Sequence, residues 1–298
     1  MSKVTKIVAR IVGGLGNQLF CYAAARRMAL VNGAELVIDD VSGFSHDRTY
    51  RRHYQLDQFK IPCRKATPAE RLEPFARLRR YLKRRLSSNV PFENRSCIQQ
   101  EGIDFDPRVL QIVPRHTVYM EGLWQSEEYF KDVEKTIRSD LRILPPTDDF
   151  NLGMAENIKK SKAVALHVRF FDKPGNPGNY NVPSDYYNRA IAQVETLVPD
   201  AHYFIFSDQP DAARKLISLP EARITLVSHN TGDQNAYADL WLMTQCQHFI
   251  ITNSTFSWWG AWLADKASQI VITPDVKSVT GVCGWGFEGL IPARWLII

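Results

Sequence analysis

Three ionisable side chains stand at the end of an apolar run in the middle of the chain, in the stretch ALHVRFFDKPGN at 165–176. Charged groups are rarely buried in a protein unless they pair with another group or bind a ligand. His167 and Arg169 are two residues apart, so both point to the same side of an extended strand. Arg169 offers a bidentate contact to a phosphate, and Asp172 offers a partner for Arg169, a cap or a general base. If these residues have no functional role, they are expected to form an internal salt bridge at the end of the strand.

A glycine-rich turn near the N-terminus, GGLGNQ at 13–18, offers a second place for an anion. Gly14 and Gly16 allow the backbone to approach a ligand closely, and the start of the following helix attracts negative charge. Asn17 and Gln18 add neutral hydrogen-bond donors. The stretch lacks both the spacing of a dinucleotide-binding fingerprint and the lysine of a P-loop. A tight turn with an ordinary helix start is the simpler interpretation.

Two further polar clusters follow predicted strands in the second half of the chain. In FSDQPD at 206–211, Asp208 is expected either to cap the next helix or to accept hydrogen bonds from guanine or ribose hydroxyls. The stretch NSTFSWWGAW at 253–262 carries more hydroxyl and amide groups at a helix start than capping requires. The polar residues of this predicted anion site are Asn253, Ser254, Thr255 and Ser257. A capped helix with its tryptophans in the core is the alternative.

The four clusters together indicate one kind of chemistry. They provide an arginine, two helix starts, hydroxyl and amide donors, and a carboxylate suited to reading a base. The sequence has no carboxylate cluster of the kind that holds Mg²⁺, no cysteine and histidine pattern with zinc-ligand spacing, and no nucleophile beside a base. The combination predicts a site that holds a nucleoside diphosphate by hydrogen bonds and an arginine, with no metal and no other cofactor.

These clusters need a scaffold that brings the ends of several strands together. Apolar runs predict strands in KIVARIVGG, ELVIDD and TVYMEGLW, and later in SKAVALHV, HYFIFSD, ITLVS, HFIITN and QIVITP. Between the strands, helices are expected, among them one at 17–33, one or two within 67–86 and one at 126–143. This alternation is typical of an α/β fold with parallel sheets, in which ligands bind beyond the carboxyl ends of the strands.

The chain is long enough for two domains. It has 298 residues, and LPPTDD at 144–149 is the best candidate for a linker. We therefore expect two Rossmann-like domains, 1–150 and 151–298, facing a central cleft. The five cysteines are scattered, which predicts reduced thiols in a cytosol-like compartment. The N-terminal apolar run is too short for a signal peptide, and no stretch approaches the roughly 20 apolar residues of a membrane-spanning helix.

Positive charge is concentrated in one segment, RLEPFARLRRYLKRRL at 71–86. It holds seven arginine or lysine residues and one glutamate, whereas the whole chain has a formal net charge of +5. The segment follows a capping-box pattern at Thr67 and Glu70, and its apolar residues share one helix face. A solvated surface helix is the simpler interpretation, and contact with an anionic membrane surface is the functional one. Nucleic acid is not expected as a partner, because aromatic residues are few.

Four motifs resemble those of the bacterial α-1,2-fucosyltransferases of glycosyltransferase family 11. They are GGLGNQLFCYAAARRMA, HVRFFD, FSDQPD and ITNSTFSWWGAWLA, and the resemblance covers nearly the whole chain. It implies a GT-B fold, GDP-β-L-fucose as donor, and an inverting, metal-independent transfer of L-fucose to the 2-hydroxyl of a galactose-type acceptor. It also implies an oligosaccharide or lipid-linked glycan as acceptor, as in O-antigen or surface-glycan synthesis. The expected location is cytoplasmic, and a peripheral position at the inner face of the membrane is the alternative.

In the second domain, the resemblance assigns Arg169 to the β-phosphate of GDP and His167 to a position against the nucleotide. Asp208 would read guanine or ribose. The diphosphate and the base would be lined by Ser254, Thr255 and Phe256. The sequence departs from the usual pattern at Phe170 and Phe171, where a second arginine and often a glycine are typical.

From the other domain, Gly14, Gly16 and Asn17 would reach the diphosphate and the fucose. Arg169 and the helix start at 254–257 would stabilise the departing GDP. Asp172 is the candidate base for the acceptor hydroxyl, and a structural partner of Arg169 is the alternative role.

Two other functions remain open on the sequence alone. One is a transferase that uses another nucleotide sugar, or an enzyme like the α-1,6- or protein O-fucosyltransferases. The other is a catalytically silent nucleotide-binding or scaffold protein, which the two phenylalanines at 170–171 would favour. Consumption of GDP-fucose separates these alternatives.

Overall fold

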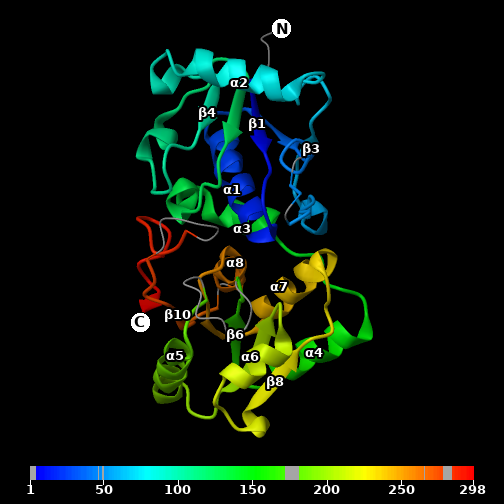
Figure 1. The fold of residues 1–298 in the computed structure, drawn as a ribbon, viewed down its shortest axis with the longest axis vertical. Helices are drawn as coiled ribbons and strands as arrows, with labels where there is room; N and C mark the ends of the chain where they lie inside the picture. Colours follow the sequence, from blue (N-terminus) through cyan, green and yellow to red (C-terminus); the bar gives the residue numbers. More distant parts are fainter. Residues whose placement is uncertain (1–4, 46, 49, 172–180, 265, 278–283) are drawn as a thin grey trace. The chain divides into compact units, whose positions relative to one another are not determined.

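The structure is a computed structural model that describes residues 5–45, 47–48, 50–171, 181–264, 266–277 and 284–298. The chain divides into two compact units (Figure 1). The first consists of the described residues of Met1–Arg142 and Glu288–Leu290, and the second of those of Ile143–Phe287 and Ile291–Ile298. The division falls shortly before residue 150, because helix α4 (Asp149–Lys159) packs against α7 (Ala236–Gln245) of the second unit.

The first unit contains a five-stranded sheet in which every pair of neighbouring strands is parallel. Its strands, in the order in which they lie in the sheet, are β3 (Arg64–Lys65), β2 (Glu35–Asp39), β1 (Lys6–Arg10), β5 (Val118–Glu121) and β4 (Cys97–Gln99). Its α-helices are α1 (Leu15–Val31), α2 (Ala76–Ser87) and α3 (Glu134–Asp140). Its 3-10 helices are η1 (Leu56–Gln58), η2 (Phe92–Asn94), η3 (Pro107–Gln111), η4 (Glu127–Tyr129) and η5 (Lys131–Val133).

The second unit contains a six-stranded, wholly parallel sheet. Its strands lie in the order β11 (Leu296–Ile297), β10 (Val271–Thr273), β9 (His248–Ile250), β6 (Ala163–Val168), β7 (His202–Ser207) and β8 (Ile224–Val227). Besides α4 and α7, its helices are α5 (Ser184–Leu197), α6 (Pro210–Leu216), η6 (Glu221–Arg223), η7 (Asp233–Asn235) and α8 (Thr255–Ala264). Two α/β units with parallel sheets confirm the predicted fold class.

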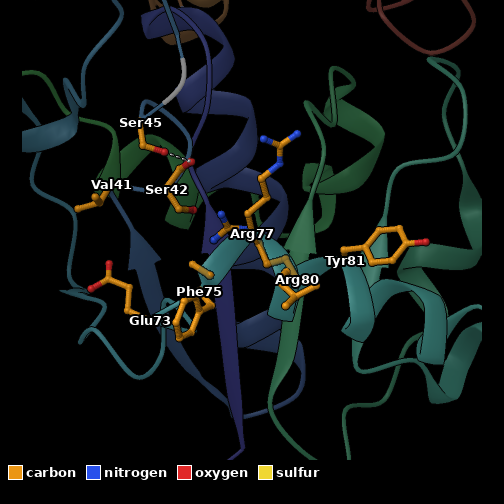
Figure 2. A pocket seen from close by; sticks show the side chains of 10 residues that line it. Val41, Ser42, Ser45, Glu73, Phe75, Arg77, Arg80 and Tyr81 are labelled. Carbon is orange, nitrogen blue, oxygen red and sulfur yellow. Dashed lines mark hydrogen bonds between the residues drawn. The ribbon is translucent and has the colours of Figure 1, made fainter.

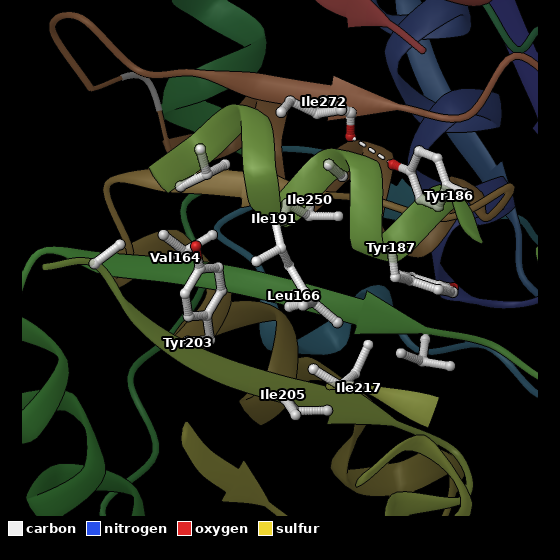
Figure 3. Close-up of a cluster of buried hydrophobic side chains, with 14 of the residues drawn as sticks. Val164, Leu166, Tyr186, Tyr187, Ile191, Tyr203, Ile205, Ile217, Ile250 and Ile272 are labelled. Atoms are coloured by element: carbon white, nitrogen blue, oxygen red, sulfur yellow. Dashed lines mark hydrogen bonds between the residues drawn. The ribbon is translucent and has the colours of Figure 1, made fainter. Parts of the chain in front are cut away.

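The core of the second unit explains why the central strands are apolar throughout. All six residues of β6 are buried, as expected for a strand covered on both faces. Figure 3 shows α5 packed over this sheet, with Ile191 directed toward Leu166 and the hydroxyl of Tyr186 directed toward Ile272. The hydroxyl of Tyr186 donates to the carbonyl of Ile272 at 3.0 Å, so its one polar group is satisfied inside the core.

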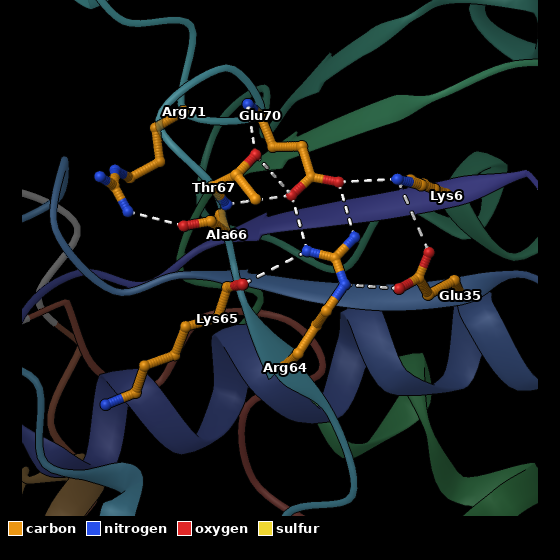
Figure 4. Close-up of polar contacts among 8 residues, drawn as sticks. All are labelled: Lys6, Glu35, Arg64, Lys65, Ala66, Thr67, Glu70 and Arg71. Atoms are coloured by element: carbon orange, nitrogen blue, oxygen red, sulfur yellow. Dashed lines mark hydrogen bonds and ion pairs between the residues drawn. The ribbon is translucent and has the colours of Figure 1, made fainter.

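Two predicted helices are shorter than expected. In the segment 67–86, the structure has turns up to Phe75 and a helix only from Ala76. Thr67 and Glu70 do form the reciprocal capping-box hydrogen bonds, at 3.0 and 3.4 Å (Figure 4). No helix follows them, because Leu72 and Phe75 both adopt a left-handed backbone with φ of 66°.

The segment 126–143 is divided into η4, η5 and α3 instead of forming one helix. Ser126 caps η4 by accepting from the backbone N–H of Glu128 at 3.1 Å. The break comes at Phe130, whose φ of −147° and ψ of 7° lie outside the helical region and whose side chain is buried in the core. Burial of this aromatic ring therefore overrides the local helical pattern.

Candidate active site

In both sheets the strand order reverses beside the first strand of the unit. β1 lies between β2 and β5, and β6 lies between β7 and β9. Ligands of parallel α/β sheets bind beyond the carboxyl ends of the strands at such a switch point. The predicted clusters follow β1, β6, β7 and β9, so the topology brings three of them to one edge of the second sheet and leaves the glycine-rich turn in the first unit.

Arg169 follows the last residue of β6 and is held by a carboxylate from the next strand. Its Nη1 lies 3.2 Å from Oδ2 of Asp208, and the Arg169 side chain keeps 30% of its surface exposed. The other carboxylate oxygen of Asp208 accepts from the backbone N–H of Phe170 at 3.1 Å. Asp208 therefore fixes the guanidinium at the edge of the sheet while leaving it accessible to a ligand.

Asp208 does not cap the following helix, which was its alternative role. The residue before α6 is Gln209, and its backbone N–H is bound by the hydroxyl of Ser207 at 3.1 Å. The salt bridge expected as an alternative for Arg169 does form, but with Asp208. The candidate base, Asp172, lies outside the described residues.

Phe171, at one of the two positions that depart from the fucosyltransferase pattern, contacts Arg169. The central guanidinium carbon of Arg169 lies 5.6 Å from the centroid of the Phe171 ring, within the range of a cation–π contact. The backbone N–H of Phe171 donates to Oδ1 of Asn181 at 2.8 Å. Phe171 thus packs against the guanidinium of Arg169 and does not displace it.

His167 is buried at the end of β6, with only 4% of its surface exposed. Its ring centroid lies 5.6 Å from that of Phe256, which links the end of β6 to the start of α8. Burial, with a smaller contribution from the charge of Arg169, lowers the pKa of His167 to about 3, so the imidazole is neutral at physiological pH. Its Nδ1 has no hydrogen-bond partner among the described residues.

The start of α8 separates into an accessible part and an internal part. Ser254, Thr255 and Phe256 are partly exposed, and the hydroxyl of Ser254 accepts from the backbone N–H of Phe256 at 3.3 Å. Asn253 and Ser257 are buried, and Ser257 donates to the carbonyl of Ser254 at 3.2 Å. The first group can meet a ligand, whereas the second holds the turn.

The tryptophans of α8 belong to the core, as the alternative interpretation of this stretch predicted. Trp258, Trp259 and Trp262 are fully buried. The rings of Trp258 and Trp259 meet edge to face, with centroids 5.0 Å apart. This packing fixes the helix whose first turn carries the polar groups.

In the first unit, α1 begins at Leu15, so Gly16 and Asn17 lie in its first turn. Gly13 has a φ of 78°, and a Cβ there would lie 2.8 Å from Nδ2 of Asn17. The turn therefore requires glycine. Oδ1 of Asn17 accepts from Nε2 of Gln125, beyond the end of β5, at 2.8 Å.

Gln18 is fully buried and holds the glycine-rich turn in place. Its Nε2 donates to the carbonyls of Gly13 and His53, at 2.9 and 2.8 Å, and its Oε1 accepts from the backbone N–H of Gln55 at 2.9 Å. We therefore place Gln18 among the residues that position the turn.

Two arrangements of polar side chains, one beside the glycine-rich turn and one elsewhere in the second unit, carried no recognisable sequence signal. The guanidinium of Arg52 lies over Gly14, with its central carbon 3.8 Å from the position of an added Cβ. In the second unit, burial raises the pKa of Asp239 to about 7, and Asn230 donates to its Oδ1 at 2.8 Å. Arg52 and Asn230 lie in loops and meet their partners only through the tertiary fold.

Two further observations concern metals and membranes. Within the described residues, no three histidine, cysteine or carboxylate side chains are grouped so that they could hold a metal ion. Among the helices of that same part of the chain, none is both long enough and apolar enough to span a bilayer.

Solved structures identify the fold as GT-B. The α-1,6-fucosyltransferase NodZ, soaked with GDP-fucose, superposes with a TM-score of 0.53 at 15% identity, covering 92% of this chain and 96% of NodZ. A mutant of Arabidopsis thaliana FUT1 in complex with GDP gives a TM-score of 0.54 at 14% identity, over 90% of this chain and 70% of FUT1. At such identities the likeness concerns the fold alone.

The chain belongs to Glycosyl transferase family 11, whose profile matches residues 7–279. The O-antigen biosynthesis glycosyltransferase WbnK of Escherichia coli is 27% identical over 278 residues, which cover 88% of this chain and 91% of WbnK. An α-1,2-colitosyltransferase of Escherichia coli is 26% identical over 277 residues, covering 90% and 91% of the two chains. The protein is therefore a glycosyltransferase, as its motifs predicted.

Proposed function

We propose that this glycosyltransferase transfers L-fucose from GDP-β-L-fucose to the 2-hydroxyl of a galactose-type residue in a glycan, with inversion and without a metal ion. The observation that carries the proposal is the pairing of Arg169 with Asp208 at the switch point of the second sheet. It presents a fixed, accessible cation where a parallel sheet receives a nucleotide. The fucosyltransferase motifs and the names of the structural neighbours support fucose as the sugar.

The reaction needs negative charge on the departing GDP to be stabilised. Arg169 and the first turn of α8 supply a guanidinium and backbone N–H groups at neighbouring strand ends, which favour a diphosphate. His167 is neutral and faces Phe256, so we assign it to packing against the nucleotide. Asp208 orients Arg169 and remains our candidate for contacts to guanine or ribose.

The acceptor hydroxyl must attack from the side opposite the leaving group, and a base must take its proton. We assign this role to Asp172, three residues beyond Arg169 in the sequence. In the first unit, Gly14, Gly16 and Asn17 are assigned to the diphosphate and the fucose. The bond from fucose C1 to the phosphate oxygen breaks, the bond from C1 to the acceptor oxygen forms, and the proton passes to the base.

A second donor has a specific observation in its favour. A relative of nearly the same similarity is named as an α-1,2-colitosyltransferase. GDP-colitose is therefore the competing donor, and the acceptor chemistry would be the same.

The test is to incubate the protein with a galactoside acceptor, EDTA and either GDP-fucose or GDP-colitose, and to analyse the product by NMR. The proposal predicts a fucosylated product with an α-linkage to the 2-hydroxyl of galactose, formed in EDTA. Linkage to another hydroxyl, dependence on added metal, or a clear preference for GDP-colitose would each contradict the corresponding part of the proposal.

A further inference from the structure

Helix α2 turns its apolar side toward solvent. Leu78, Leu82 and Leu86 are each four residues apart and so form one stripe along the helix. They are 57%, 47% and 71% exposed, and Phe75, just before the helix, is 75% exposed. In the part of the chain that the structure describes, no other helix exposes as many large apolar side chains. We call these three leucines the leucine stripe.

The leucine stripe is bordered by positive charge. Arg77, Arg79 and Arg85 are exposed on the same helix. The helix, Ala76–Ser87, contains six arginine or lysine residues and no carboxylate. An apolar stripe flanked by cations is the pattern of helices that lie in the interface of a membrane.

The inward side of α2 explains this orientation. Nε of Arg84 lies 2.7 Å from Oε2 of Glu121, and Nζ of Lys83 lies 4.8 Å from the centroid of the Tyr119 ring. Arg80 is 8% exposed and also faces the sheet. Because β5 presents a buried carboxylate and a tyrosine to the helix, Arg80, Lys83 and Arg84 face inward and the leucines are left outside.

A hollow of about 630 Å³ at the start of α2 extends the apolar surface (Figure 2). On the helix side its apolar lining includes Phe75, Leu78 and Tyr81, and Arg77 and Arg80 add charge. The loop after β2 closes the other side. The hollow shares Leu78 with the leucine stripe, so the two form one surface.

We propose that α2 docks along its length on the surface of an anionic phospholipid bilayer. The leucine stripe and Phe75 enter the boundary between head groups and acyl chains, and Arg77, Arg79 and Arg85 lie against lipid phosphates. The charge of the helix is complementary to an anionic lipid surface and opposes a second copy of itself, since two such helices would bring like charges together. The inference does not depend on the identity of the donor or the acceptor.

The test is sedimentation of the full chain with vesicles of phosphatidylcholine, with and without phosphatidylglycerol. We expect binding only when phosphatidylglycerol is present, and weaker binding at high salt because surface charges are screened. Replacing all three leucines by serine should weaken binding by about 100-fold or more. The triple variant Arg77→Gln, Arg79→Gln, Arg85→Gln should lose about 100-fold, at about 1 kcal/mol for each cation.

A matched control is the double variant Phe150→Ser, Leu152→Ser on α4, which removes exposed apolar side chains elsewhere and should bind like the wild type. Turnover with a soluble acceptor, measured on the same samples, should be unchanged in all variants, so a failure of docking is distinguishable from a failure of the proposed activity. Absence of binding to phosphatidylglycerol vesicles, or equal binding by the leucine variant, would overturn the proposal. So would a wild-type dimer that the leucine variant dissociates, since a second copy would then cover the stripe.

Discussion

Arg169 is oriented by Asp208, and under the proposed function this pairing determines how the guanidinium meets a phosphate. Both carboxylate oxygens of Asp208 are engaged, one by Arg169 and one by the backbone of Phe170. The guanidinium is thus fixed before a ligand arrives, and such preorganisation is what lowers the barrier for a departing anion. The low pKa of His167 keeps the neighbouring imidazole neutral, so it does not compete for the same phosphate.

Replacing Arg169 by alanine should lower kcat by about 10²- to 10³-fold, because it removes the donor that stabilises the leaving group. The measurement is the steady-state rate of fucosyl transfer, with a urea unfolding curve to confirm that the variant is folded. Arg189→Ala is the matched control, since the Arg189 side chain is exposed on α5 and pairs only with Asp185 of the same helix among the described side chains. If Arg169→Ala turned over as fast as Arg189→Ala, the role of Arg169 would be refuted.

At this scale, the sequence was sufficient to find the polar groups but not their partners. His167, Arg169, Asp208 and the start of α8 could be recognised because each lies at or just beyond the end of an apolar strand. That Asp208 would orient Arg169 could not be predicted, because an aspartate just before a predicted helix is equally typical of a helix cap. Arg52 and Asn230 lie in loops without periodicity, so only the fold places them beside Gly14 and Asp239.

At the scale of elements, the buried strands were the most predictable part, since a strand covered on both faces needs a continuous apolar run. Short edge strands such as β3 and β11 have exposed residues and gave no such signal. Helix α2 was predicted in the correct region, but its orientation depends on Glu121 and Tyr119 of a strand far away in the sequence. The capping box at Thr67 and Glu70 forms, but no helix follows it. This local motif therefore did not by itself predict a helix.

Glu70 instead fastens the edge of the first sheet. Its carboxylate accepts from Lys6 at 2.8 Å and from Arg64 at 2.7 Å (Figure 4). The hydrogen bond from Arg64, followed by smaller contributions from Lys6 and Thr67, holds the pKa of Glu70 well below its ordinary value. A carboxyl group whose pKa is lowered on folding stabilises the folded state while it is ionised.

Glu70→Gln should therefore reduce the free energy of unfolding by about 1–2 kcal/mol at pH 7, a figure moderated by the partial exposure of Lys6 and Arg64. The contribution is complete above the unfolded-state pKa of about 4.5 and is lost as the pH falls toward the folded-state value. Urea unfolding of both proteins at pH 7 and at low pH should show the difference narrowing with acid. The exposed Glu93→Gln is the control. A difference independent of pH would contradict the role of the ionised carboxylate.

At the scale of the whole molecule, the alternation of strands and helices predicted two α/β units, and the structure contains two wholly parallel sheets. The boundary was less predictable, because the proline-rich linker and α4 both belong to the second unit, while 288–290 belongs to the first. The short segment 288–290 has no distinctive composition, so the sequence does not predict that it belongs to the first unit. The switch points, by contrast, follow from the order of strands, and the predicted polar clusters lie beside them.

The central claim is fucosyl transfer, and the most direct measurement is the initial rate of GDP release from GDP-fucose in EDTA, with and without a galactoside acceptor. We expect release that depends on the acceptor and proceeds with EDTA present. No release with any galactoside, in a protein that still binds GDP, would contradict the proposed transfer and favour a silent nucleotide-binding protein. Failure to bind GDP at all would contradict the site built on His167, Arg169 and the start of α8.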